Sequence, residues 1–269
     1  MNVSTDFAAG WTELSLPGPD VEEYFRAWAT NRSVVVSDYE VLWESTDLDS
    51  WTVHEFPVTE VNWPVWTGRV EGALVAVASD GRVEILDGSR PEECDALPPT
   101  VRDGVWLDST LHVLTQDTTA ALWSSSDACR WRSIDLPDMD RPSLDIVEGS
   151  VVVTPSLFTE EPDPVSYRLV ADGWSEPIAG NVLEPFRARI PGREFDPFLE
   201  VITAGDRTVV ASATTPPGLL IATEDGTTQV ATLSGILLDL DDVAYFADQL
   251  VLVGRRNAAS GFVIAGPIP

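Results

Sequence analysis

The sequence of 269 residues has no lysine, two cysteines and two histidines. Cys94 and Cys129 are too few for a disulfide framework and lack Cys-x-x-Cys spacing, so we expect both to be packing side chains. His54 and His112 form no metal-ligand motif. No apolar stretch approaches the roughly 18 residues of a membrane helix, and MNVSTDFAAG lacks the basic and apolar regions of a signal peptide. These absences predict a cytoplasmic protein outside the membrane.

The charge of the chain has one dominant sign. Its 44 acidic residues face 16 basic ones, all of them arginine, which gives a formal net charge of -28. Such a field repels nucleic acid and anionic membranes and attracts cations and basic proteins. We therefore expect a small polar molecule or a protein as the partner, and a monomeric chain. A surface that is acidic only for solubility is the alternative interpretation.

A seven-residue sequence motif recurs along the chain. WTELSLP begins at Trp11, and the related motifs WTVHEFP and WRSIDLP begin at Trp51 and Trp131. Short runs rich in valine and leucine lie between the copies, such as SVVVSD from Ser33 and LHVLTQD from Leu111. These runs, bounded by Gly, Pro, Asp and Ser, are typical of β-strands. A repeated unit of about forty residues with four short strands indicates a propeller blade, because such a sheet buries both faces only when neighbours stack on it.

Six such units predict an all-β fold, a six-bladed β-propeller of four-stranded blades in a single domain. The C-terminal unit stops after its third strand, and WTELSLP supplies the missing outer strand, so we expect the N-terminus to close the ring. Closure would remove the two sheet edges that an open array exposes. The single domain covers 1–269, with an outer strand in 1–17, blades at 21–57, 58–98, 99–137, 138–180 and 181–235, and the last blade at 236–269.

The turn before three of the repeated tryptophans is itself repeated. It reads STDFAAGW from Ser4, STDLDSW from Ser45 and SSDACRW from Ser125. It resembles the Asp-box (BNR) hairpin, Ser/Thr-x-Asp-x-Gly-x-x-Trp, of sialidase-like propellers. The first copy has the family's spacing with Ala8 in place of glycine, and the other two are one residue shorter. The resemblance covers nearly the whole chain as architecture and implies structural aspartates that bind backbone amides of a tight turn, namely Asp6, Asp47 and Asp127.

Acidic residues stand at the start of every predicted inner strand. In propellers of this kind, the loops that enter the inner strands surround one mouth of the central channel. A ring of carboxylates there would raise some of their pKa values and would suit a hard cation such as Ca²⁺, a cationic ligand, or acid/base chemistry. Solvated loops without a function are the alternative. The ring consists of Glu23, Glu60, Asp103, Asp145, Glu200 and Asp242, of which Asp103, Glu200 and Asp242, with Tyr245, are the catalytic candidates.

Arginines form the second candidate set. Arg187, Arg189 and Arg193 lie in an insertion, NVLEPFRARIPGREFDPFLE, where they predict a lid that holds a carboxylate, a phosphate or a sialic-acid-like anion. A packed surface loop is an equal alternative. The sialidase resemblance implies three channel arginines, and Arg26, Arg102 and Arg141 also lie near inner strands, but the family's arginine motif is absent before the first Asp box. Most aromatic residues beside the inner strands are expected to be core: Tyr24, Trp28, Trp63, Trp66, Trp106 and Tyr245.

Two classes of function remain open at this point. The first is a ligand- or partner-binding propeller that uses the channel mouth, and the sequence favours it. The second is an enzyme, a glycosidase-like hydrolase or a lyase or cyclase, that uses channel carboxylates on a small polar or cationic substrate. The sialidase-like superfamily includes glycosidases, assembly factors and binding proteins. Because GxSxG, HExxH and Walker motifs are absent, we expect no cofactor, with Ca²⁺ as the one metal considered.

Overall fold

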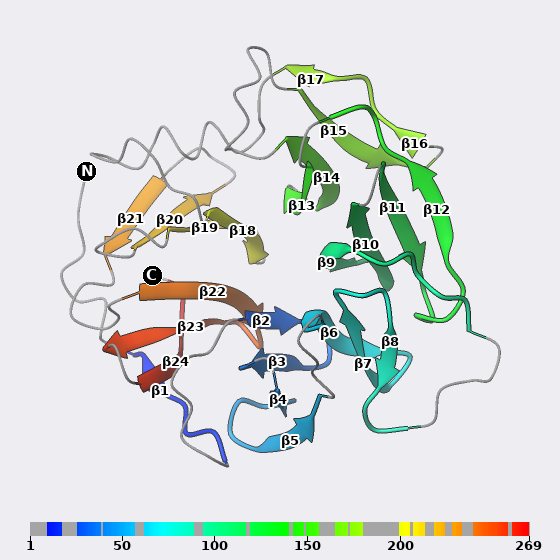
Figure 1. Cartoon of the computed structure of the whole chain (residues 1–269). Helices are drawn as coiled ribbons and strands as arrows, with labels where there is room; N and C mark the ends of the chain where they lie inside the picture. Colours follow the sequence, from blue (N-terminus) through cyan, green and yellow to red (C-terminus); the bar gives the residue numbers. More distant parts are fainter. Residues whose placement is uncertain are drawn as a thin grey trace. The chain divides into compact units, whose positions relative to one another are not determined.

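Among the residues that the structure describes, every regular element of the computed structural model is a β-strand, as the sequence predicts for the fold class (Figure 1). The strands are short and rich in valine, leucine and isoleucine. The structure describes residues 10–17, 26–38, 40–56, 62–88, 94–116, 119–139, 142–147, 149–155, 165–171, 173–179, 199–204, 207–212, 218–223, 228–232, 239–257 and 260–268.

The chain forms two compact units. The first unit contains Met1–His54 and Leu183–Pro269, and the second contains Glu55–Val182. Among the described residues, each unit carries three antiparallel sheets, in which strands consecutive in sequence pair with one another, except that the N-terminal β1 joins the C-terminal sheet.

The first unit holds three four-stranded sheets. One has the order β2 (Arg26–Ala29), β3 (Val34–Ser37), β4 (Val41–Ser45) and β5 (Trp51–Glu55). Another has the order β18 (Leu199–Ala204), β19 (Arg207–Ser212), β20 (Gly218–Thr223) and β21 (Thr228–Thr232). The third has the order β22 (Asp239–Phe246), β23 (Gln249–Asn257), β24 (Ser260–Gly266) and β1 (Thr12–Glu13).

The N-terminal strand completes the C-terminal sheet. Thr12 lies opposite Ala265 and Glu13 opposite Ile264 in an antiparallel ladder between β1 and β24. The amide of Leu14 extends this ladder by donating to the carbonyl of Val263 at 2.9 Å. The WTELSLP segment therefore supplies the outer strand that the C-terminal repeat lacks.

The second unit holds three sheets of different composition. The first has only three strands among the described residues, β6 (Pro64–Val70), β7 (Ala73–Ala78) and β8 (Val83–Ile85). The second has four strands, β9 (Val101–Leu107), β10 (Thr110–Gln116), β11 (Ala120–Ser125) and β12 (Arg132–Asp135). In the third, β13 (Pro142–Val147) and β14 (Ser150–Pro155) precede β15 (Val165–Val170), which pairs with both β16 (Gly173–Trp174) and β17 (Ile178–Ala179).

Two sheets of the second unit therefore differ from the four-stranded pattern that the repeat predicts. Residues 94–98, which the repeat places in an outer strand, are described without strand structure. In the last sheet the outer position is divided between β16 and β17, with Ser175 to Pro177 between them.

The sheets bury apolar faces against one another. In the first unit, one core cluster joins β19 and β20 to β22–β24, and another joins β22–β24 to β2–β4. In the second unit, Leu114 and Leu122 pack with Leu144 and Val151 of the next sheet. Since each buried leucine or valine contributes about 1.5–3 kcal/mol, these interfaces hold consecutive sheets together. As a result, the first strands of consecutive sheets, meaning the strand of each sheet that comes first in the chain apart from β1, lie beside one another. Strand β22 contacts β2 and β18, and β9 contacts β6 and β13.

Candidate functional site

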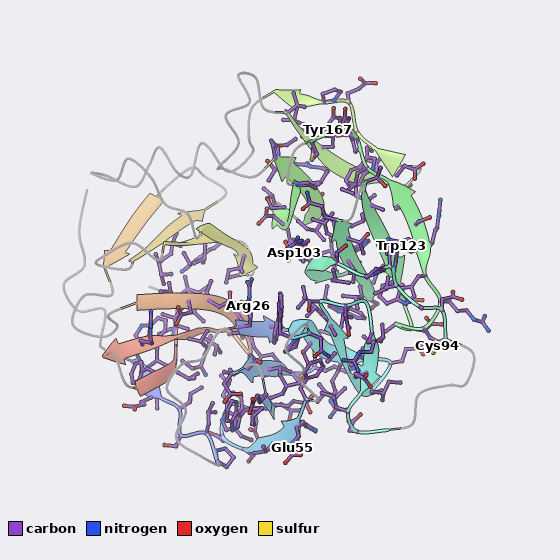
Figure 2. All side chains as sticks on the ribbon, viewed as in Figure 1. Arg26, Glu55, Cys94, Asp103, Trp123 and Tyr167 are labelled. Atoms are coloured by element: carbon purple, nitrogen blue, oxygen red, sulfur yellow. A yellow bond between two sulfur atoms is a disulfide. The ribbon has the colours of Figure 1, made fainter. Side chains whose placement is uncertain are left out.

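The first strands carry the predicted carboxylates that the structure describes. Asp103 lies in β9, Asp145 in β13 and Asp242 in β22, while Glu200 lies in β18 with its backbone paired to Ala211. Figure 2 labels Asp103 on its strand. Glu23 and Glu60 lie outside the described residues.

Asp103 connects two neighbouring first strands. Its Oδ1 accepts a hydrogen bond from the amide of Gly104 at 2.8 Å, and its Oδ2 accepts one from the amide of Leu144 in β13 at 3.1 Å. Arg102 is the extra residue of a β-bulge just before it, because Val101 and Asp103 pair with consecutive residues of β10. The bulge aims the carboxylate along the sheet edge toward β13.

Asp242 repeats this arrangement in the first unit. Its Oδ1 accepts from the amide of Val243 at 2.8 Å, and its Oδ2 accepts from the amide of Ala27 in β2 at 2.9 Å. A register shift again precedes it, at Asp241. Arg26 Nη1 lies 3.9 Å from Asp242 Oδ2, and the arginine side chain is 52% exposed while the aspartate is 3% exposed. Both aspartates therefore have a structural role, which the sequence pattern alone does not indicate.

Asp145 is a carboxyl group of this set with a raised pKa. It is partly buried, and the hydroxyl of Ser143 donates to its Oδ2 at 3.5 Å. Burial, together with the negative charge of Asp103, raises the pKa of Asp145 from the usual 3.8 to about 7. The bond from Leu144 to Asp103 brings the two carboxyl groups near each other. Asp103 and Asp145, which we call the carboxylate pair, thus place a group with a pKa of about 7 beside a second carboxyl group whose charge raises that pKa.

The side chain of Tyr245 lies away from the Asp242 carboxylate. It follows Asp242 by three residues in a regular stretch of β22, so the two side chains lie on opposite faces of the strand. Its hydroxyl donates to Asp248 Oδ1 at 3.1 Å, and its ring packs against the core of the first unit. The two catalytic candidates of this strand are therefore separated by the sheet.

The candidate arginines are only partly described. Arg102 occupies the bulge of β9 and is exposed, and Arg26 is the partner of Asp242. The predicted lid arginines, and the last member of the set, fall outside the described residues, namely Arg141, Arg187, Arg189 and Arg193.

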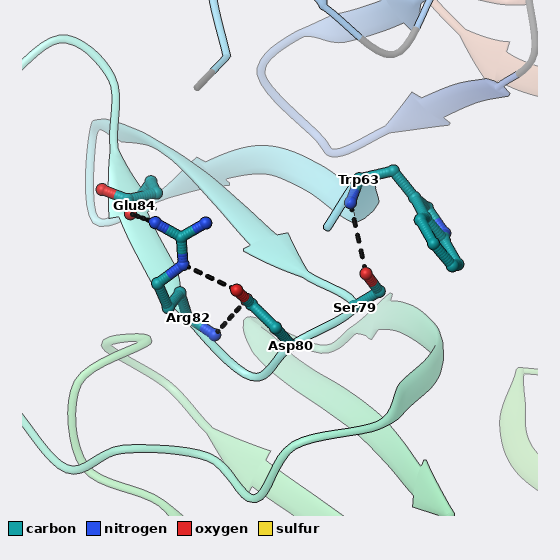
Figure 3. Close-up of polar contacts among 5 residues, drawn as sticks. All are labelled: Trp63, Ser79, Asp80, Arg82 and Glu84. Carbon is teal, nitrogen blue, oxygen red and sulfur yellow. Dashed lines mark hydrogen bonds and ion pairs between the residues drawn. The ribbon is translucent and has the colours of Figure 1, made fainter. Parts of the chain in front are cut away.

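An exposed tryptophan, Trp63, directly precedes β6, which lies beside the strand that carries Asp103. The amide of Trp63 donates to Ser79 Oγ at 3.2 Å, as Figure 3 shows, and the amide of Ser79 donates to the carbonyl of Trp63 at 2.9 Å. The carbonyl of Ser79 in turn accepts from the amide of Val101 at 2.9 Å.

The Trp63 side chain is 43% exposed, whereas Trp66 is buried and stacks on Trp106 at 6.0 Å between centroids. Trp66 fits the predicted core role, and Trp63 does not.

The two described Asp-box-like turns have the local geometry that the resemblance implies. Asp47 Oδ1 accepts from the amides of Asp49 and Ser50 at 2.9 and 2.7 Å. Asp127 Oδ1 accepts from the amides of Cys129 and Arg130 at the same two distances. The structural role predicted for both aspartates is confirmed, and Asp6 lies outside the described residues.

The acidity of these turn aspartates follows from the same hydrogen bonds. The amides of Ser50 and Asp49 lower the pKa of Asp47. Burial acts to raise the pKa of Asp127, but hydrogen bonds from Arg130 and Cys129 outweigh it and lower the pKa.

The prediction that both cysteines are packing residues is wrong. Cys94 and Cys129 form a disulfide across 35 positions of sequence within the second unit. The spacing contains no recognised motif, so only the fold, which brings residues 94–98 to the Asp127 turn, reveals the pair. The described residues contain no group of three or more side chains that could hold a metal ion, and no described helix is long and apolar enough to cross a membrane.

The similarities to solved structures define the class of the fold. No family model and no curated protein matches the chain. The chain is similar to a gluconolactonase from Xanthomonas campestris, with TM-score 0.57 and 12% identity over 99% of this chain and 94% of that one. It is similar to a catalytically inactive virginiamycin B lyase from Staphylococcus aureus, with TM-score 0.57 and 9% identity over 96% and 99%. It is also similar to the WD40 β-propeller domain of Doa1, with TM-score 0.53 and 11% identity over 96% and 97%.

These similarities show that the chain has a β-propeller fold, and at such low identity they show the fold alone. The fold hosts enzymes as well as a WD40 domain, so the function has to be argued from the residues of the site.

Proposed function

We propose that the chain is a closed six-bladed β-propeller in one domain that binds a small polar ligand at the mouth formed by the loops before its first strands. In this proposal a positively charged group of the ligand lies at the carboxylate pair. The observation that carries the proposal is the environment of Asp145. Its pKa is raised to about 7 because it is desolvated and faces the charge of Asp103. A cation bound there would offset both effects, so binding is favourable and releases a proton.

The net charge of -28 supports the same ligand class, because it concentrates cations around the protein. The exposed Trp63 directly precedes β6, the strand beside β9, and in this proposal its aromatic face would add a cation–π contact to the ligand. A partner protein that presents a lysine or an arginine would use the same chemistry.

The second candidate function is an enzyme that uses the carboxylate pair. A carboxyl group with a pKa of about 7 beside a second carboxyl group suits a general acid. Solved structures with the same fold include a gluconolactonase and a virginiamycin B lyase. The corresponding reaction is that of a glycosidase-like hydrolase, or of a lyase or cyclase, on a small polar or cationic substrate, with Asp145 as the acid.

The experiment that tests the binding proposal is calorimetric titration near pH 6.5 in buffers of different ionisation enthalpy, at about 0.15 M salt to screen long-range attraction. The ligands are spermidine, choline, arginine and Ca²⁺. We expect one class to bind with the release of up to about one proton, and Asp145→Asn to abolish that release. Asp108→Asn is the matched control, because it removes an exposed charge from the turn after β9.

Equal binding to the wild type, Asp145→Asn and Asp108→Asn would overturn the proposal, because it would show that only the overall negative charge of the protein attracts the ligand. A ligand that is converted during the titration, with conversion lost in Asp145→Asn, would favour the enzyme instead. Turnover is followed by mass spectrometry of the same samples.

A further inference from the structure

The disulfide lies where two polypeptide segments of the second unit meet. Cys129 belongs to the Asp127 turn, and Cys94 opens the segment Cys94–Pro98, which we call the tether segment. Two hydrogen bonds run alongside the disulfide. The amide of Asp95 donates to the carbonyl of Cys129 at 2.8 Å, and the amide of Trp131 donates to Asp95 Oδ2 at 3.3 Å.

The tether segment also packs on the turn between β7 and β8. Leu97 is 5% exposed, so its side chain is part of the core. A Cβ atom placed on Gly81 would lie 2.7 Å from the Leu97 carbonyl oxygen and 2.5 Å from that of Pro98, which shows how close the two backbones approach. The tether segment thus spans from one sheet to the Asp-box-like turn of the next, in a position where no described strand pairs with β8.

The polar contacts described at this crossing reach solvent. Asp95 is exposed, and both cysteines are only partly buried. The two hydrogen bonds named above are individually weak compared with the backbone entropy that the five-residue segment gains when it is released. The disulfide adds a covalent constraint that ties the segment to the Asp127 turn.

We propose that the Cys94–Cys129 disulfide is a redox-sensitive latch that holds the tether segment to the Asp127 turn. A dithiol reductant opens it by exchange: one thiolate attacks a cysteine sulfur, the second thiol closes on the mixed disulfide, and two cysteine thiols and an oxidised dithiol result. An oxidised protein dithiol closes it by the reverse exchange. The latch is closed in an oxidising compartment and open in a reducing cytoplasm, so its state depends on where the chain resides.

Hydrogen exchange of the full-length chain, with and without dithiothreitol, tests the latch. We expect reduction to increase exchange at the amides of Asp95 and Trp131 by about tenfold or more, because they lose a constrained partner. The Asp47 turn is the internal control: it has the same aspartate–amide bonds and no cysteine, so exchange at Asp49 and Ser50 should not change. The thermal midpoint should fall by roughly 5–10 °C.

The double variant Cys94→Ser/Cys129→Ser separates the latch from other effects of the reductant. It should show the fast exchange of the reduced chain in both conditions. Non-reducing peptide mapping after alkylation verifies the linkage in the oxidised sample. Two alkylated cysteines in that sample, or equal exchange at Asp95 with and without reductant, would overturn the proposal.

Discussion

The Oδ2 atom of Asp242 accepts a hydrogen bond from the amide of Ala27 at 2.9 Å, although 215 residues separate the two along the chain. Asp103 makes the equivalent bond to Leu144 across 41 residues. In both cases an aspartate that follows a β-bulge uses one oxygen for its own strand and the other for the next first strand. The recurrence of acidic residues at the inner strands therefore has a structural cause at two of its positions, because each carboxylate joins consecutive sheets.

Removing either bridging carboxylate should destabilise the protein. Asp242→Ala and Asp103→Ala each remove a charged acceptor from two amides, and hydrogen bonds to charged groups contribute about 1.5–3 kcal/mol. We expect urea unfolding to show a loss of that size for each variant. Asp135→Ala, at an exposed position of β12, is the control and should lie within about 0.5 kcal/mol of the wild type. Losses below the control value in both variants would contradict the bridging role.

The ionisation of Asp145 should lower the free energy of unfolding as the pH rises toward neutrality. Its folded pKa of about 7 exceeds the unfolded value of 3.8, so the native state binds more protons than the unfolded state between these values. The free energy of unfolding therefore decreases with pH in this window. Asp145→Asn should raise stability at pH 8 by roughly 1–3 kcal/mol and flatten the profile between pH 4 and 7, since one pKa unit equals about 1.4 kcal/mol and the group is partly buried.

Urea unfolding at several pH values measures this effect, and Asp108→Asn corrects for the loss of a charge in so acidic a chain. A pH slope that persists unchanged in Asp145→Asn would show that other groups cause it. Asp103→Asn should lower the pKa of Asp145, because it removes the neighbouring negative charge.

The sequence predicted what local patterns and repetition determine. The run SVVVSD, for example, forms β3 as predicted. The repeated Ser-x-Asp turns at Asp47 and Asp127 have nearly identical hydrogen bonds, because each turn is closed by its own residues. The sequence identified Asp103 and Asp145 as candidate site residues. It could not show that the pKa of Asp145 is raised, because this pKa depends on burial and on a neighbour in another sheet. The disulfide was missed for the same reason: its partners meet only after two sheets have stacked.

Gly81 should tolerate a side chain less well than Gly149, although both have positive φ values of 84° and 67°. An alanine Cβ at Gly149 would meet nothing within 4 Å, so Gly149→Ala costs only the left-handed strain of about 1 kcal/mol. At Gly81 the same atom would lie 2.5 Å from the Pro98 oxygen, and overpacking adds about 1–3 kcal/mol. Equal losses in chemical unfolding would contradict the close packing of the tether segment.

Gly266 and Trp11 provide a test of the N-terminal strand. A Cβ on Gly266 would lie 2.3 Å from the indole of Trp11, so Gly266→Ala forces the tryptophan, and β1 with it, away from β24. We expect a loss of about 1–3 kcal/mol and faster proteolysis near the N-terminus. Deleting residues 1–17 should destabilise the sheet further, because it exposes the edge of β24 to other chains and promotes aggregation. In the deleted chain, Gly266→Ala should have almost no effect, since its contact is gone. A full additional loss there would show that Gly266 is constrained by residues other than Trp11.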